Sequence, residues 1–465
     1  MGLVAGFMVP HPPMIIPDVG RGSESKIQET IDSYEKVAKE IAAIEPDTII
    51  ITSPHSTMYS NYFHISPGKE AKGDFGDFRA SGVKFEEEYD FELVNQIEEK
   101  TFDDGFPAGF EGEREKKLDH GTMVPLYFIR KFYKGGRIVR IGLSGLSLVD
   151  HYQLGIYIRD AVNEMGRKAV FVASGDLSHK LQDYGPYGFA KEGPEYDKRI
   201  MDVSGRAAFD EMLEFDEDFC DKAAECGHRS FVIMAGAFDG LNVDANVLSH
   251  QDVTGVGYGI VTFYPGTENE NRCFLQKQQL KVEEKYTHSD GYVLLAREVI
   301  ELYIKERRKL KIPDDISENL MGMLPEEMFS RRAGAFVSIH KHGSLRGCIG
   351  TIGPATNSLA QEIINNAISA STRDPRFDPI TEEELKWLEI NVDILGDAED
   401  IDSKEQLDVK RYGVIVSCGR RRGLLLPDLE GVDDVDTQIS IAMKKGGIKP
   451  EDDYKLQRFE VVRHY

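Results

Sequence analysis

The stretch Leu3-Val4-Ala5-Gly6-Phe7-Met8-Val9-Pro10-His11-Pro12-Pro13 is a short apolar run that leads into a histidine between prolines. Its uninterrupted apolar and small residues predict a buried strand. A second such run, residues 48–52, leads into His55, and the chain between the two runs has apolar residues at helical spacing until Pro46. Strands that alternate with helices in this way are typical of a layered α/β domain.

Two later apolar runs, 137–143 and 169–173, also have the length of strands, and the second leads into Ser174-Gly175-Asp176-Leu177-Ser178-His179. Strands that end at one edge of an α/β sheet present their terminal loops to a common crevice. We therefore expect His11 and His55 to meet around one metal ion, because neutral imidazole is a common metal ligand. The segment 68–80, rich in Gly, Asp and Phe, predicts a loop that covers such a site.

A third ligand is expected downstream, and the best candidate is Glu225 in Ala224-Glu225-Cys226-Gly227-His228. Two histidines and one carboxylate with open coordination positions favour Fe(II) and oxygen chemistry. His179 follows a predicted strand and has a suitable pKa for a catalytic base that moves the protons of a substrate hydroxyl. His120, in Leu118-Asp119-His120-Gly121, is a candidate hydrogen-bond donor to substrate or oxygen, or alternatively a residue at a helix start.

These fragments together resemble the LigB-type class III extradiol dioxygenase family over roughly residues 1–265. The resemblance implies an iron-dependent, ring-cleaving dioxygenase that uses O2 on a small catechol-like or other electron-rich hydroxylated compound. It also implies roles for the matching residues: His11, His55 and Glu225 as iron ligands, His179 as acid/base and His120 as a donor in the active site.

The same region is similar to Memo-type proteins, in which a cysteine stands near the carboxylate position. Cys226 is therefore an alternative third ligand, and a thiolate favours softer metals such as Cu(I) or Zn. Two further functions stay open: a zinc-dependent hydrolase that uses the same site, and a non-enzymatic, Memo-like module that binds copper or iron.

The polar segment 269–286 predicts a linker between a first domain, 1–268, and a smaller second domain, 287–465. The second domain has predicted helices at 289–309 and 358–371 among several short strands, so we expect an α+β fold. Its stretch Leu345-Arg346-Gly347-Cys348-Ile349-Gly350-Thr351 resembles the AMMECR-type family over residues 287–465.

The Leu345–Thr351 stretch brings a cysteine close to an arginine. Cys348 beside Arg346 is a candidate nucleophile, although a structural turn with a buried cysteine is the favoured interpretation. The order of the two domains resembles that of the AmmeMemoRadiSam system, which implies a radical SAM partner protein, since this chain has no CxxxCxxC cluster.

The 465-residue chain carries 80 acidic and 56 basic residues, a formal net charge of −24. This charge argues against nucleic acid or an anionic membrane as a partner and favours a small molecule or a protein. The five cysteines form no CxxC pair, as is compatible with a reducing compartment. The N-terminal apolar run stops at Pro10, too early for a signal peptide or a membrane span. We expect a soluble, cytoplasmic protein, and a homo-oligomer is compatible with the sequence.

Overall fold

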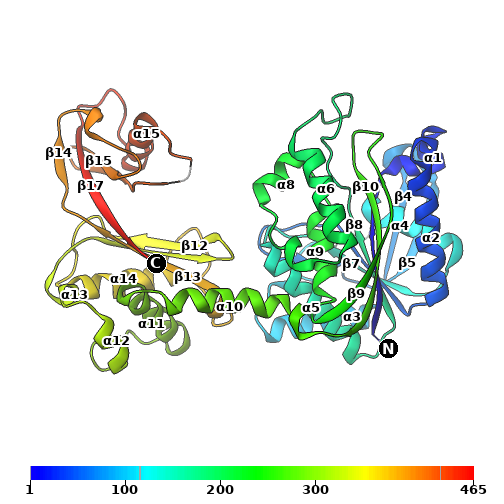
Figure 1. Ribbon diagram of the computed structural model, residues 1–465, viewed down its shortest axis with the longest axis horizontal. Coiled ribbons are helices and arrows are strands. Elements are labelled where there is room, and N and C mark those ends of the chain that lie inside the picture. The colour runs from blue at the N-terminus through cyan, green and yellow to red at the C-terminus, as the bar shows by residue number, and fades with distance from the viewer. Residues whose placement is uncertain (1, 115–116, 430) are drawn as a thin grey trace. The chain divides into compact units, whose positions relative to one another are not determined.

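The computed structural model describes residues 2–114, 117–429 and 431–465. It divides into two compact units, Met1–Gln278 and Gln279–Tyr465. The point of division lies inside the predicted linker, 269–286, and that segment is largely helical because α10 spans Phe274–Thr287. The chain is coloured from one end to the other in Figure 1.

The first unit is built on a six-stranded sheet with the order β7-β2-β8-β1-β10-β9. The strands are β1 (Leu3–Val9), β2 (Thr48–Ser53), β7 (Arg137–Gly142), β8 (Ala169–Ser174), β9 (Leu241–Gln251) and β10 (Tyr258–Glu268). The first four are parallel to one another, and β10 and β9 complete the sheet in antiparallel pairs. The four apolar runs of the sequence are these parallel strands, which confirms the predicted α/β class.

Helices cover both faces of this sheet, and this is why its central strands are apolar without interruption. Along β1, Phe7 belongs to the core on the side of α2 and α4, whereas Met8 belongs to the core on the opposite side. The larger helices are α2 (Gln28–Ile44), α3 (Phe91–Asp103), α4 (His120–Phe132), α5 (Leu148–Glu164), α6 (Glu192–Gly205) and α9 (His228–Gly236). The shorter elements are α1 (Pro17–Gly20), α7 (Phe209–Met212), α8 (Glu217–Ala223), β3 (Phe63–His64) and β6 (Ala108–Gly109).

The segment predicted as a loop, 68–80, is instead the start of a β-hairpin formed by β4 (Glu70–Phe75) and β5 (Ala80–Glu88). The two strands pair with each other, so the backbone amides and carbonyls of this glycine-rich segment form hydrogen bonds. Composition alone did not reveal this pairing. Phe78, in the turn of the hairpin, lies with its ring centroid 5.3 Å from that of His120. The segment therefore borders the predicted site, as expected, although its structure differs.

The second unit contains a seven-stranded antiparallel sheet, with the path β12-β11-β13-β17-β15-β16 and with β14 paired to β17. The strands are β11 (Ala335–Lys341), β12 (Ser344–Gly350), β13 (Leu388–Leu395), β14 (Glu399–Ile401), β15 (Tyr412–Cys418), β16 (Arg421–Leu425) and β17 (Lys455–His464). Its helices are α11 (Gly291–Glu306), α12 (Glu318–Met323), α13 (Glu327–Ser330), α14 (Leu359–Thr372) and α15 (Val435–Gly446). The predicted α+β class is confirmed.

The strands of this second sheet alternate between two faces. In β11, Ala335, Val337 and Ile339 are buried in a core that includes residues of α11 and α14, whereas Phe336 and Ser338 are only half-buried. Side chains at successive strand positions point to opposite faces, so Phe336 and Ser338 lie on the face away from these helices.

Candidate metal centre

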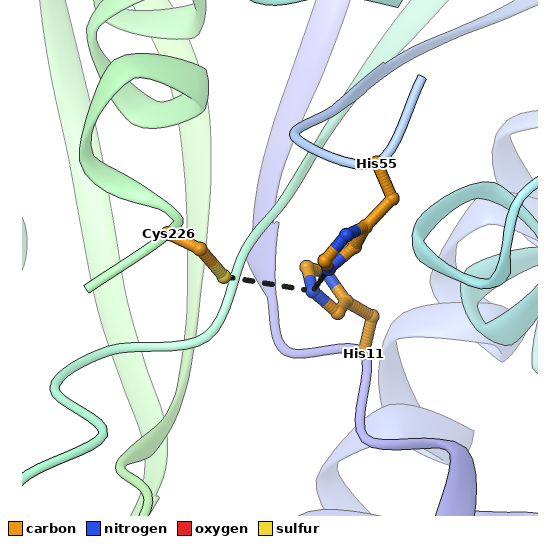
Figure 2. Close-up of side chains that lie close together, drawn as sticks. All are labelled: His11, His55 and Cys226. Atoms are coloured by element: carbon orange, nitrogen blue, oxygen red, sulfur yellow. Dashed lines mark hydrogen bonds between the residues drawn. The ribbon is translucent and has the colours of Figure 1, made fainter. Parts of the chain in front are cut away.

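His11 and His55 lie against each other where β1 and β2 end (Figure 2). Their Nε2 atoms are 3.0 Å apart. His11 is buried, with 1% of its surface exposed, whereas His55 is exposed. Two parallel strands have therefore carried two histidines, 44 residues apart, to one edge of the sheet.

A hydrogen-bond chain fixes the tautomer of His11. The hydroxyl of Ser174, at the end of β8, donates its only proton to the carbonyl of Gly121 at 2.6 Å. The same oxygen lies 2.9 Å from Nδ1 of His11, so it accepts a hydrogen bond from Nδ1–H. The lone pair of His11 is therefore on Nε2, the atom that faces His55 and that a metal would use.

The third side chain at this point is Cys226, whose Sγ lies 3.6 Å from Nε2 of His11 (Figure 2). The ligand atoms of His11, His55 and Cys226 all lie within 4.8 Å of one another. Two ligand atoms that each lie about 2.0–2.3 Å from one ion can be as far as about 4–4.6 Å apart. Small movements of the side chains would therefore allow all three atoms to bind a single ion. Two imidazoles and a thiolate form a suitable donor set for zinc, copper or iron.

A close contact between two glycines brings Cys226 to the site. A Cβ on Gly175 would lie 2.1 Å from Cα of Gly227, so the two backbones touch only because neither residue has a side chain. The neighbouring backbones then join: the amide of Cys226 donates to the carbonyl of Asp176 at 3.3 Å, and the amide of Asp176 donates to Sγ of Cys226 at 3.3 Å.

Glu225, the predicted third ligand, has a different partner. Its Oε2 accepts a hydrogen bond of 2.6 Å from the backbone amide of His228, the first residue of α9. A carboxylate at this position satisfies a free amide at the start of a helix. Among the residues that the structure describes, the cluster of potential ligand atoms contains Cys226 in place of Glu225. The alternative ligand of the sequence analysis is thus the one that the geometry favours.

His120 is the first residue of α4, and its ring centroid lies 4.0 Å from that of His55 and 5.4 Å from that of His11. The helix is capped by Asp119 rather than by His120, since Asp119 accepts a hydrogen bond from the amide of Thr122 at 3.0 Å. His120 is therefore available to the site and is not needed to cap the helix.

His179 is half-buried, and backbone groups of Ala224 and Leu177 form hydrogen bonds with its ring. Among the described residues, its Nδ1 has no partner of normal hydrogen-bond geometry. Its ring contacts that of Tyr187 edge-on, with centroids 5.1 Å apart. A buried nitrogen without a partner is costly unless another molecule supplies one. This observation is consistent with contact between His179 and a bound molecule.

The electrostatic surroundings keep these imidazoles neutral. Burial lowers the pKa of His11 well below its ordinary value, and the charges of His55, His120 and His179 lower it further. Desolvation likewise lowers the pKa of His55 and His179, and lowers that of His120 to about 4. Neutral imidazoles at pH 7 can bind a metal or accept a proton.

Asp176 is a residue whose part in the site the sequence analysis missed, although the motif that contains it was identified. Its Oδ1 accepts a hydrogen bond of 2.7 Å from the amide of His11, and burial raises its pKa to about 7. Burial also raises the pKa of the Cys226 thiol, with further contributions from Asp176 and Glu225. A metal would therefore have to displace the thiol proton on binding.

Residues 5–261 match the family described as the catalytic LigB subunit of aromatic ring-opening dioxygenase. The chain belongs to the LigB family. Residues 293–464 match the AMMECR1 family, so a LigB domain is followed by an AMMECR1 domain.

Individual proteins are similar to this chain over its whole length or over part of it. Protein CA_C1420 of Clostridium acetobutylicum is 40% identical over 475 aligned residues, which cover 100% of this chain and 99% of that protein. A protein of Thermotoga maritima is 50% identical over 175 residues, 37% of this chain and 96% of its own length. The solved structure of the uncharacterized protein PH0010 from Pyrococcus horikoshii is 30% identical, covers 38% of this chain and 89% of that chain, and has a TM-score of 0.34.

The second predicted site is only partly assembled. Cys348 and Arg346 do not face each other as the sequence suggested, because a bulge in β12 leaves Arg346 without a partner residue in β11. Arg346 instead binds both carboxylate oxygens of Glu384, at 2.8 and 2.9 Å. The arginine next to Cys348 is Arg376, which donates to the Cys348 carbonyl at 3.2 Å.

Within the described parts of the chain, no helix combines the length and the apolar character that crossing a bilayer requires.

Proposed function

We propose that the LigB domain is a metal-dependent oxidoreductase of the dioxygenase type, with Fe(II) held by His11, His55 and Cys226, that acts on a small catechol-like or other electron-rich hydroxylated compound. The observation that carries this proposal is the convergence of these three ligand atoms within 4.8 Å, beside the ring of His120 and with His179 close enough to lower the pKa of His11. The family match supports the reaction class.

The donor atoms of the site fit the metal. Nε2 of His11 carries a free lone pair because Nδ1 is committed to Ser174, and the buried thiol of Cys226 becomes a thiolate when a cation replaces its proton. When bound, the iron would supply open coordination positions at which an electron-rich ring and O2 can exchange electrons.

The remaining residues bind and orient the substrate and move its protons. His179, neutral and with an unpaired Nδ1, would accept the proton of a substrate hydroxyl and later return it. His120, at the start of α4, has its ring beside that of His55 and would donate a hydrogen bond to the oxygen atoms of the substrate. Phe78 packs edge-on against His120 and would exclude water from that side.

A second candidate function is a module that holds Cu(I) or Zn without turnover, and the specific observation that favours it is Cys226. A thiolate in place of a carboxylate shifts preference toward softer metals. If the bound metal is zinc, the same site would support hydrolysis through an activated water. The radical SAM partner implied by the domain order stays a prediction.

The test is an anaerobic titration of the full-length, metal-free protein with Fe(II), Zn(II) and Cu(I), followed by oxygen-electrode assays with a panel of catechols. We expect one Fe(II) per chain, oxygen uptake with at least one catechol, and loss of both in Cys226→Ser. Glu225→Gln is the matched control and should retain the metal. His179→Gln should retain the metal but lose turnover.

Three outcomes would contradict the proposal in different ways. Metal binding without oxygen uptake for any catechol, together with tight Cu(I) binding, would favour the non-enzymatic module. One equivalent of zinc, with Fe(II) unable to support any reaction, would favour the hydrolase. Retention of metal in Cys226→Ser with loss in Glu225→Gln would restore the two-histidine, one-carboxylate site.

A further inference from the structure

The AMMECR1 domain contains a cavity of about 700 Å³ on the sheet face that does not carry α11 and α14. Its floor is a row of polar side chains across three strands: Cys348 of β12, Ser338 of β11 and Asn391 of β13 are register partners. The hydroxyl of Ser338 donates to Sγ of Cys348 at 3.2 Å. A volume of this size lies within the range of small-molecule sites, about 300–1,000 Å³.

Apolar side chains form a second part of the lining. Phe336 lies next to the polar row on β11, and Leu424, Leu426 and Leu429 come from β16 and the segment after it. The ring of Phe336 occupies the place where a side chain at position 350 would be, since a Cβ on Gly350 would lie 2.2 Å from that ring. The cavity can therefore bury the apolar body of a ligand.

The charged side chains of the lining are mostly cationic. Among the described residues, four cationic side chains line the cavity, those of Arg376, Arg422, Lys445 and Arg463, against one acidic side chain, that of Asp393. Tyr465 also lies in the lining and interacts with Arg463. The excess of cationic side chains stands out in a chain with a formal net charge of −24. Positive charge concentrated in a concave site attracts anions.

Two of these cations are already neutralised by buried carboxylates. Arg463 binds Asp393 at 2.8 Å, and Arg376 binds Asp374 at 2.7 Å. Arg422 donates only to the uncharged amide oxygen of Gln457, at 3.3 Å, and no ion pair of Lys445 is found in the described parts of the chain. Arg422 and Lys445 therefore supply the charge that a ligand would meet.

Close packing holds these two cations on one wall. A Cβ on Gly423 would lie 1.8 Å from the carbonyl oxygen of Ala442, and a Cβ on Gly446 would lie 2.7 Å from the amide nitrogen of Gly423. Helix α15 thus lies directly on β16, because these two glycines leave no side chain between them. Arg422 and Lys445 are the neighbours of these glycines in the sequence, so their backbones are fixed.

We infer that this cavity binds a small amphipathic organic anion, with its carboxylate or phosphate at Arg422 and Lys445 and its apolar body against Phe336 and the lining leucines Leu424, Leu426 and Leu429. The ligand lies over Cys348, whose thiol reports on occupancy. This site is independent of the metal centre and does not rest on the proposed function.

The test measures the rate at which iodoacetamide alkylates Cys348 in the full-length protein, read from the mass of the peptide that contains it. Octanoate and 4-phenylbutyrate are the probes, and octanol, 4-phenylbutanol and inorganic phosphate are the comparison compounds. We expect the two carboxylates at saturation to slow alkylation by about tenfold or more. The alcohols lack the charge and phosphate lacks the apolar body, so these compounds should protect far less at equal concentration.

The variant Arg422→Gln/Lys445→Gln should need about 10–100-fold more carboxylate for the same protection, since each tenfold corresponds to about 1.4 kcal/mol and two charged contacts are lost. The matched control is Arg420→Gln/Lys444→Gln, which removes the same charge at adjacent positions outside the lining. Absence of protection by both carboxylates would overturn the inference. Equal protection by the alcohols, or an equal effect of both double variants, would overturn it as well.

Discussion

The two units of this protein form their candidate sites in different ways. In the LigB domain, parallel strands end at one edge of the sheet, and the side chains just after them meet although they are distant in the sequence. In the AMMECR1 domain, antiparallel strands place alternate side chains on one face, and a cavity forms across the strands rather than at their ends.

Sheet topology decides which sequence pattern reveals a site. A histidine at the end of a strand can be recognised from the sequence alone, because the apolar run that precedes it identifies the strand. A cavity wall made of a few side chains from each of several strands has no such marker, since no single stretch of the sequence contains it.

Cys226 and Cys348, both half-buried, distinguish the two sites most clearly. Cys226→Ala should weaken metal binding by more than about 100-fold, since losing a direct ligand exceeds the roughly 10–100-fold effect of losing a group that orients one. Cys348→Ala should leave metal affinity unchanged, because Cys348 lies in the cavity of the other unit. Isothermal titration of both variants checks this, and equal losses would mean that the two sites are not separate.

The orientation of His11 provides the next largest expected effect. Ser174→Ala removes the hydrogen-bond acceptor of Nδ1–H, so metal affinity should fall by about 10–100-fold. Ser230→Ala is the matched control, because the Ser230 hydroxyl is buried without a hydrogen-bond partner in the described chain. The same titration measures both, and an unchanged affinity in Ser174→Ala would show that another contact fixes the ring.

The cavity of the AMMECR1 domain depends on the contact between α15 and β16. Gly423→Ala should lower the local free energy of unfolding by about 1–3 kcal/mol, because the new methyl group overlaps the Ala442 carbonyl. Gly353→Ala, where a Cβ meets nothing within 4 Å, should have no such cost. Hydrogen exchange of the β16 amides measures the difference, and equal protection in the two variants would contradict the close packing.

The smallest expected effect concerns Asp374, which accepts hydrogen bonds from Arg376 and from the amide of Cys348 at 2.8 Å. These contacts, that of Arg376 first, hold the pKa of its carboxyl well below the ordinary 3.8. Asp374→Asn should lower the free energy of unfolding at pH 7 by about 1–2 kcal/mol.

The pH dependence of this effect has a definite sign. A carboxyl whose folded pKa is depressed stabilises the fold above its unfolded pKa of about 3.9, and this contribution is lost as the pH falls through that value toward the folded pKa. The difference between wild type and Asp374→Asn should therefore shrink below about pH 4. The single tryptophan, Trp387, is buried in this unit, so its fluorescence during urea unfolding reports on it. A difference that grew in acid would contradict this sign.

Much of the fold could be predicted from the sequence. The four apolar runs became the parallel strands β1, β2, β7 and β8, because a strand buried on both faces must be apolar throughout. The segment 68–80 was misjudged as a loop, since short strands with alternating exposure and many glycines leave a weak pattern.

The choice between Glu225 and Cys226 could not be made in advance. Adjacent residues after a helix point in different directions, and the direction depends on backbone angles that sequence patterns do not fix. Here Ala224 takes the left-handed conformation at the end of α8, and the contact between Gly175 and Gly227 holds the next segment. Cys226 then faces His11, while Glu225 binds the start of α9.

The sequence by itself determined the strands, the order of the two domains and the histidines that follow the strand ends, because these depend on local hydrophobic pattern and on the geometry of parallel sheets. Only the tertiary structure decided that Cys226 stands beside His11, that Arg376 rather than Arg346 lies next to Cys348, and that Arg422 and Lys445 line one cavity. These arrangements depend on contacts between segments far apart in the chain, and no local pattern encodes the direction in which a side chain leaves a turn or a bulge.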